Sequence, residues 1–123
     1  MMKWILSLLI VFSAVALAAT SAKDAYLMLK NNQAIFIDVR EADEVKDGMI
    51  EKATWMALSK LKVDNSWEKE LRESSKGKKI FLYCRSGRRS EIARELLKQQ
   101  GIEAENIGGY ETLKTELPTT KGK

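Results

Sequence analysis

Residues 79–90 read KIFLYCRSGRRS, which combines an apolar run, a polar turn and the start of an amphipathic segment. The apolar run over 79–83 is rich in strand-forming residues, which is typical of a strand covered on both faces of a parallel sheet. The polar residues after Cys84 predict a tight loop around Gly87, and the periodicity that follows predicts a helix over 90–100, ended by Gly101. Strand, loop and helix in this order are the repeating unit of an α/β fold.

The same alternation continues on both sides of this stretch. Three further apolar runs predict strands, at residues 34–37, 54–57 and 102–107. Three segments with capping or periodicity signals predict helices, at residues 22–29, 67–74 and 110–117. The apolar-periodic settings of Trp55, Trp67 and Ile92 place them in the core. The sequence therefore predicts a single α/β domain over 22–118, with a small central parallel sheet flanked by helices on both faces, and a frayed tail over 119–123.

The first residues differ in composition from the rest of the chain. After a basic start at Lys3, residues 4–19 contain no charged side chain and end in small residues. This is the pattern of a secretory signal peptide, and the run is shorter than the ~20 apolar residues that span a bilayer. We therefore expect a signal peptide over 1–18, cleaved near Ala18 or Ala19, no stable membrane anchor, and a monomer in the periplasm.

Composition excludes several classes of function. The net charge of +4, from 21 basic and 17 acidic residues, is too small to indicate nucleic-acid binding. Histidine is absent, which excludes Ser-His-Asp triads, Cys-His pairs and nearly every catalytic zinc site. Cys84 is the only cysteine, so the chain can form neither an intramolecular disulfide nor a multi-cysteine metal site. We expect no metal and no cofactor.

Cys84 nevertheless stands where a reactive group is expected. It follows a predicted strand directly, and open parallel sheets bind ligands at the carboxyl ends of their strands. Gly87 can adopt a positive φ, so successive backbone N–H groups of the loop can point inward beside the positive end of the helix dipole. The neighbouring Arg85, Arg88 and Arg89 also lower the pKa of a cysteine. These residues predict an anion-binding loop around a thiolate that needs no histidine.

The pattern Cys84-x-x-Gly87-x-Arg89-Ser90 resembles the active-site loop of the rhodanese family of sulfurtransferases. Three other segments resemble signatures of this family: Asp-Val-Arg at 38–40, Gly-His-Ile-Pro-Gly-Ala at 48–53, and Asn-x-Gly-Gly at 106–109. The second signature departs from the family at Met49, Glu51 and Lys52, which weakens the match in that turn but does not affect the cysteine loop. A single domain behind a signal peptide is similar to the small exported rhodanese of the phage shock response.

The loop and the resemblance imply a two-step sulfur transfer through Cys84. The thiolate attacks a small anionic donor such as thiosulfate, and the resulting persulfide passes its sulfur to cyanide or a thiol. The residues expected to bind the donor follow Cys84 directly: Arg85, Ser86, Gly87, Arg88, Arg89 and Ser90. Among them Arg89 closes the loop by reaching donor oxygens or loop carbonyls, Arg85 and Arg88 lie at the rim, and Ser90 alternatively caps the helix.

Asp38 and Arg40 are expected to form a supporting ion pair at the end of the neighbouring strand, with a helix cap as the alternative for Asp38. Two other functions remain open. A persulfide carrier or binding module would use the same cysteine with a dedicated protein partner. Cysteine-dependent phosphatases and arsenate reductases place an arginine after five residues, whereas here four residues separate Cys84 from Arg89.

Overall fold

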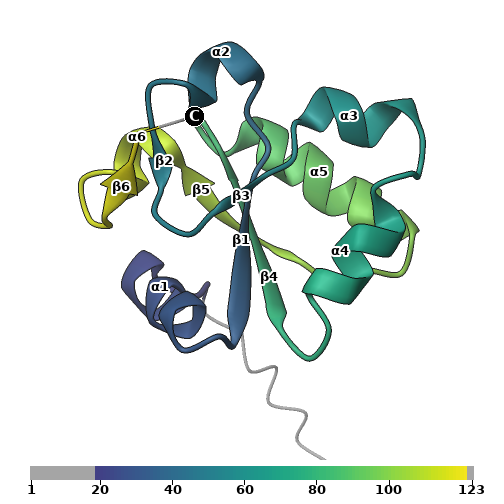
Figure 1. The fold of residues 1–123 in the computed structure, drawn as a ribbon, viewed down its shortest axis with the longest axis horizontal. Helices are drawn as coiled ribbons and strands as arrows, with labels where there is room; N and C mark the ends of the chain where they lie inside the picture. Colours follow the sequence, from purple (N-terminus) through teal and green to yellow (C-terminus); the bar gives the residue numbers. More distant parts are fainter. Residues whose placement is uncertain (1–18, 122–123) are drawn as a thin grey trace, which may run out of the picture.

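A four-stranded parallel sheet forms the centre of the molecule (Figure 1). The computed structural model describes residues 19–121. The strands lie in the order β3 (Thr54–Trp55), β1 (Ala34–Asp38), β4 (Lys79–Cys84), β5 (Glu105–Gly109). Asp38 lies opposite Tyr83, and Cys84 lies opposite Gly109, so the carboxyl ends of three strands meet at one edge of the sheet. The predicted α/β class and parallel sheet are confirmed.

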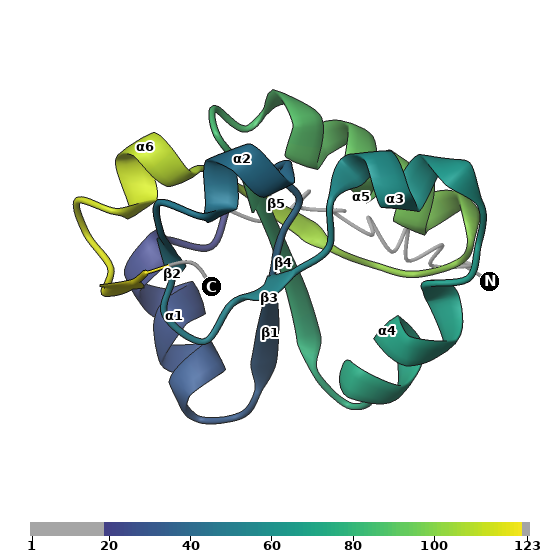
Figure 2. The ribbon, with the colours of Figure 1, turned by 45° about the horizontal axis from the view of Figure 1, so that its top comes forward.

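Helices cover both faces of this sheet (Figure 2). One face packs against α1 (Ala22–Lys30) and α6 (Tyr110–Leu113), and the other against α3 (Leu58–Val63), α4 (Glu68–Ser74) and α5 (Arg88–Gln99). Side chains alternate between the two faces along each strand, as the pleat requires. In β4, Phe81 and Tyr83 point towards α1, whereas Leu82 and Cys84 point towards α5. The site cysteine is therefore on the face that its own helix covers.

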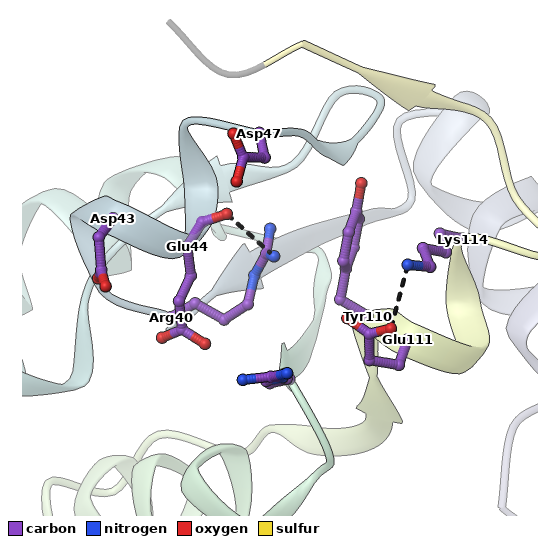
Figure 3. A pocket seen from close by; sticks show the side chains of 8 residues that line it. Arg40, Asp43, Glu44, Asp47, Tyr110, Glu111 and Lys114 are labelled. Atoms are coloured by element: carbon purple, nitrogen blue, oxygen red, sulfur yellow. Dashed lines mark hydrogen bonds and ion pairs between the residues drawn. The ribbon is translucent and has the colours of Figure 1, made fainter.

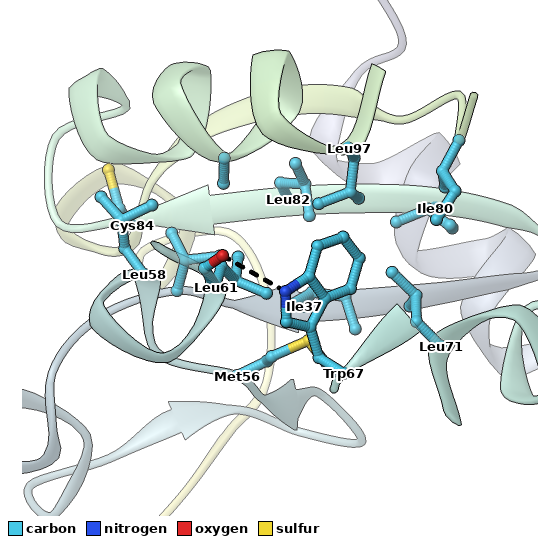
Figure 4. Close-up of a cluster of buried hydrophobic side chains, with 13 residues drawn as sticks. Ile37, Met56, Leu58, Leu61, Trp67, Leu71, Ile80, Leu82, Cys84 and Leu97 are labelled. Atoms are coloured by element: carbon cyan, nitrogen blue, oxygen red, sulfur yellow. Dashed lines mark hydrogen bonds between the residues drawn. The ribbon is translucent and has the colours of Figure 1, made fainter. Parts of the chain in front are cut away.

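The core beneath α3, α4 and α5 is built around Trp67, which is 2% exposed (Figure 4). Its indole N–H donates a hydrogen bond to the carbonyl of Leu61 at 3.2 Å, which satisfies its polar atom inside the core. Cys84 belongs to the same cluster and is fully buried. The predicted core position of Trp67 is confirmed.

The predicted core positions of Trp55 and Ile92 are wrong, because the two side chains are 46% and 41% exposed. Trp55 lies on the edge strand β3, where only one neighbouring strand covers it, and its indole N–H donates to the carbonyl of Arg40 at 2.7 Å. Helix α5 buries Ala93 and Leu97, so the adjacent Ile92 turns towards solvent. For Ile92, the sequence alone does not show whether an apolar residue at the border of a helix face is buried or exposed.

The fold is completed by short elements that the sequence did not indicate. They are α2 (Ala42–Val45), α3, and the antiparallel pair formed by β2 (Met49–Ile50) and β6 (Thr119–Thr120). The prediction of a frayed tail is therefore wrong for residues 119 and 120. These threonines are exposed and held by backbone pairing with β2, which side-chain composition does not reveal.

The predicted signal peptide lies outside the described residues. Between residues 19 and 121, no helix has the length and hydrophobicity needed to cross a bilayer.

Candidate active site

Cys84 is the last residue of β4, and the loop of Arg85, Ser86 and Gly87 connects it to α5. Gly87 is the N-cap of α5 and has a φ of +99°, a left-handed conformation that favours glycine. The loop therefore turns sharply enough to direct its backbone N–H groups at the cysteine. The Gly87 N–H donates a hydrogen bond to Cys84 Sγ at 2.9 Å.

Ser90 is the second group in contact with the sulfur. Its hydroxyl oxygen lies 3.4 Å from Cys84 Sγ and 2.8 Å from Asn106 Oδ1, so its single hydrogen is within reach of both acceptors. Since α5 begins at Arg88 and its N-cap residue is Gly87, the interpretation of Ser90 as the helix cap is wrong. Ser90 is instead a buried side chain directed at the cysteine.

Opposing influences set the pKa of the Cys84 thiol. Burial raises the pKa because it penalises the charged thiolate. Hydrogen bonds from the Ser90 hydroxyl and from the backbone N–H groups of Ser90, Gly87 and Ser86 lower it, and they outweigh burial. The pKa of Cys84 therefore lies below its ordinary value, as the loop sequence predicts.

Asn106 and Gly109 of β5 hold the loop in place. Asn106 Nδ2 donates to the Gly87 carbonyl at 2.8 Å, and Asn106 Oδ1 accepts the Gly108 N–H at 3.0 Å. A Cβ atom at Gly109 would lie 2.7 Å from Ser86 Cα, so only glycine lets the loop cross this strand. The sequence indicated a turn at 106–109 but not its contact with the cysteine loop.

Arg89 forms a two-pronged ion pair with Glu44, which belongs to α2. Its Nη1 and Nη2 atoms lie 2.5 Å and 2.7 Å from the two carboxylate oxygens. This contact lowers the pKa of Glu44 to about 2. The expected bond from Arg89 to a loop carbonyl is replaced by this link between α5 and α2, which the sequence did not indicate. Arg85 and Arg88 are exposed.

The predicted pair of Asp38 and Arg40 is buried beside the loop. Arg40 Nη2 lies 2.7 Å from Asp38 Oδ2, and the Arg40 backbone N–H donates to Asp38 Oδ1 at 2.9 Å. The same guanidinium donates to the Gly48 carbonyl at 2.6 Å. Since the N-cap residue of α2 is Glu41, the alternative of Asp38 as a helix cap is wrong. Arg40 thus fixes the turn that contains the divergent second signature.

A hollow of about 400 Å³ lies beside the loop (Figure 3). Its lining joins α2 and the turn after it to α6 and the loop: Arg40, Asp43, Glu44, Asp47, Arg85, Tyr110, Glu111 and Lys114. The Arg40 guanidinium lies 4.0 Å from the centre of the Tyr110 ring. Among residues 19–121, no group of three His, Cys, Asp or Glu side chains is arranged to hold a metal ion.

Residues 21–116 match the Rhodanese-like domain family. The chain belongs to this family. A rhodanese-related protein from Thermoplasma volcanium has a similar structure, with a TM-score of 0.67 and 28% identity over 83% of this chain and 96% of the other. A rhodanese from E. coli solved with anions superposes with a TM-score of 0.60 and 26% identity, over 72% and 99% of the two chains.

Two relatives by sequence carry activity names. The rhodanese domain is 27% identical to thiosulfate sulfurtransferase GlpE of Coxiella burnetii, over 79% of this chain and 87% of that protein. It is 37% identical to a putative mitochondrial thiosulfate sulfurtransferase of Schizosaccharomyces pombe, over 62% of this chain and 57% of that protein. The match thus spans little more than half the length of the yeast relative.

Proposed function

We propose that this rhodanese is a sulfurtransferase that takes sulfane sulfur from thiosulfate or a similar donor and passes it to cyanide or a thiol through a Cys84 persulfide. The observation that carries the proposal is the loop geometry at Cys84, where N–H and O–H donors lower the pKa of a buried thiol. The names of the relatives support the same activity.

In the first step, the Cys84 thiolate attacks the outer sulfur of thiosulfate. A new bond forms between Cys84 Sγ and this sulfur, the S–S bond of thiosulfate breaks, and its electron pair leaves with sulfite. The total charge of −3 is the same before and after. No proton moves, because sulfite is an adequate leaving group, so the absence of histidine is no obstacle.

The loop stabilises the product of this step. The persulfide keeps one negative charge, and its outer sulfur extends from Cys84 Sγ into the ring of N–H groups that already surrounds the thiolate. Arg85, Ser86, Gly87, Arg88, Arg89 and Ser90 are the proposed donor-binding residues. The Asp38–Arg40 pair supports them from β1 by holding the adjacent turn.

Burial of Cys84 restricts the donor. The residue has no exposed surface, so a bulky reacting group cannot approach its sulfur freely. The terminal sulfur of thiosulfate is one atom wide, whereas a phosphoryl group presents a tetrahedral centre surrounded by oxygens. This favours sulfur transfer over phosphate ester hydrolysis.

Export is the second part of the proposal. The uncharged run over residues 4–19 supports a signal peptide that is cleaved near Ala18 or Ala19, which leaves a monomeric enzyme in the periplasm. Sequencing the N-terminus of the protein from a periplasmic extract tests this. A sequence that starts near Thr20 agrees with export, and one that starts at Met1 in a membrane fraction contradicts it.

The activity is tested by thiocyanate formation from thiosulfate and cyanide. We expect turnover by the wild-type protein and none by Cys84→Ser, because the serine hydroxyl has a far higher pKa and does not act as the sulfur-accepting anion. An aryl phosphate is the comparison substrate. Phosphate release without thiocyanate formation would favour the phosphatase alternative, and sulfur loading without turnover would favour the carrier.

A further inference from the structure

Arg89 does not meet the cysteine loop as an isolated positive charge. Its guanidinium contacts both carboxylate oxygens of Glu44, at 2.5 Å and 2.7 Å, so the two side chains together carry no net charge. The pair is only partly exposed, with 31% of the Arg89 side chain and 20% of the Glu44 side chain open to solvent. Among the three arginines of residues 85–89, the least exposed one therefore has its charge cancelled.

Glu44 is also held in position from its own helix. Its Oε1 atom accepts the backbone N–H of Glu41 at 3.1 Å, and Arg40 Nη1 donates to its backbone carbonyl at 3.4 Å (Figure 3). Arg40 is in turn bonded to the buried carboxylate of Asp38. Since both its side chain and its backbone are bonded within this region, the position of the Glu44 charge does not depend on Arg89 alone.

The charges of this pair lie within electrostatic reach of the reacting sulfur. The hydrogen-bonded Glu44 carboxylate raises the pKa of Arg89 against the effect of burial, and the negative charge of Cys84 raises it further. Arg89 also directly precedes Ser90, whose hydroxyl oxygen lies 3.4 Å from Cys84 Sγ. An anion that reacts with Cys84 therefore experiences the attraction of Arg89 and the repulsion of Glu44 together.

We propose that Glu44 is a specificity-determining residue for the sulfur donor, because it lowers the preference of the loop for doubly charged donors. A donor with two negative charges gains about twice as much from Arg89, and loses about twice as much to Glu44, as a donor with one. Cancelling the Arg89 charge therefore lets a singly charged donor compete with thiosulfate. This inference rests on the proposed function, because it concerns the donor of the first step.

Methanethiosulfonate is the matched probe, because a methyl group replaces one charged oxygen of thiosulfate. The Cys84 thiolate attacks the outer sulfur of this anion and forms a bond to it. The S–S bond of the donor breaks, and its electron pair leaves with methanesulfinate. The persulfide and methanesulfinate carry the two negative charges that the thiolate and the donor brought, so no proton moves and no oxidant or reductant is consumed.

The test is the ratio of kcat/KM for thiosulfate to kcat/KM for methanethiosulfonate, with cyanide as the common acceptor. Both donors load the same Cys84, so a variant that only displaces the loop lowers both values by similar factors and leaves the ratio unchanged. We expect Glu44→Gln to raise the ratio about 3- to 10-fold, because the extra charge of thiosulfate is no longer repelled across a partly exposed site. The rise should shrink in about 0.5 M salt.

Arg89 supplies the reciprocal test. Arg89→Gln leaves Glu44 without its partner, so the ratio should fall below the wild-type value. In Glu44→Gln/Arg89→Gln both charges are gone, so the ratio should lie between those of the two single variants. This order separates charge from a structural role, because either single substitution breaks the same link between α5 and α2.

The matched control is Glu68→Gln on α4, away from α2, which removes the carboxylate of another arginine pair, Glu68–Arg72 at 2.8 Å (Figure 1). Its ratio should equal that of the wild-type protein, and urea titrations establish that each variant is folded in the assay. An unchanged or lower ratio for Glu44→Gln, or a shift in the same direction for both single variants, would overturn the assignment. If the wild-type protein transfers sulfur from neither donor, the proposed function itself fails.

Discussion

At Cys84, hydrogen bonds to the sulfur outweigh the effect of burial. The buried thiol would resist ionisation without the donors supplied by Gly87 and Ser90. These donors come from the loop backbone and one hydroxyl, so they are neutral and fixed in position. The loop therefore favours the thiolate by local geometry, in a chain that has no histidine to accept the thiol proton.

Ser90→Ala tests the contribution of the hydroxyl. Removing this hydrogen bond raises the pKa of Cys84, so the pH profile of alkylation by iodoacetamide should shift to higher pH. Ser74→Ala, at an exposed position on α4, is the control and should leave the profile unchanged. An unchanged or downward-shifted profile for Ser90→Ala would show that the hydroxyl does not stabilise the thiolate.

Arg89→Ala is expected to raise the KM for thiosulfate about 10- to 100-fold, because a charge-assisted hydrogen bond to an anion contributes about 1.5 to 3 kcal/mol. The pair with Glu44 fixes this guanidinium beside the loop while using two of its five N–H groups. Arg85→Ala and Arg88→Ala should have smaller effects that fade in about 0.5 M salt. A larger effect of either exposed arginine at high salt would refute this order.

At the scale of elements, β5 supports the loop that β4 and α5 carry. Gly109→Ala should strongly reduce sulfur loading, since the added methyl group would meet the Ser86 backbone and displace the loop. Gly77→Ala is the comparison, because nothing lies within 4 Å of the position of its added Cβ, although its φ of +72° costs some stability. Persulfide yields measured by intact mass should fall only for Gly109→Ala. Equal yields would mean that the loop tolerates displacement.

The Arg89–Glu44 pair joins α5 to α2 and makes the free energy of unfolding depend on pH. The pKa of Glu44 falls from 4.5 to about 2 on folding, so its contribution is complete above the unfolded pKa and is lost as the pH drops through the folded value. At neutral pH Glu44→Gln should lower the free energy of unfolding by about 1 to 2 kcal/mol. This difference should disappear between about pH 5 and pH 2 in urea titrations. A difference that is constant over this range would contradict the ion pair.

Elements with a continuous pattern were predictable from the sequence, and elements made by backbone contacts were not. Hydrophobicity predicts the strand over 79–83, and periodicity predicts the helix after it. By contrast, α2 spans only Ala42–Val45 and β6 is held by pairing with β2. In the site, Cys84 and the loop were identifiable, because residue type and strand position carry the chemistry. Glu44 and Asn106 act through contacts between distant segments, which a single sequence does not display.

At the scale of the whole molecule, the parallel sheet assembles the site by bringing three strand ends to one edge. β1 contributes Asp38 and holds Arg40 beside it, β4 contributes Cys84, and β5 contributes the supporting Asn106 and Gly109. The cores on the two faces keep these strands in register, so the loop is positioned by the whole domain. The whole domain thus positions the single cysteine of a chain that contains no histidine.

The proposal that Cys84 accepts a sulfur atom is tested by the intact mass of the protein after incubation with thiosulfate. We expect the wild-type protein to gain the mass of one sulfur atom, which cyanide removes, and Cys84→Ser to gain none. Digestion should place the added sulfur on the peptide that contains Cys84. An unchanged mass for a folded wild-type protein with a titratable thiol, or the same gain in Cys84→Ser, would contradict it.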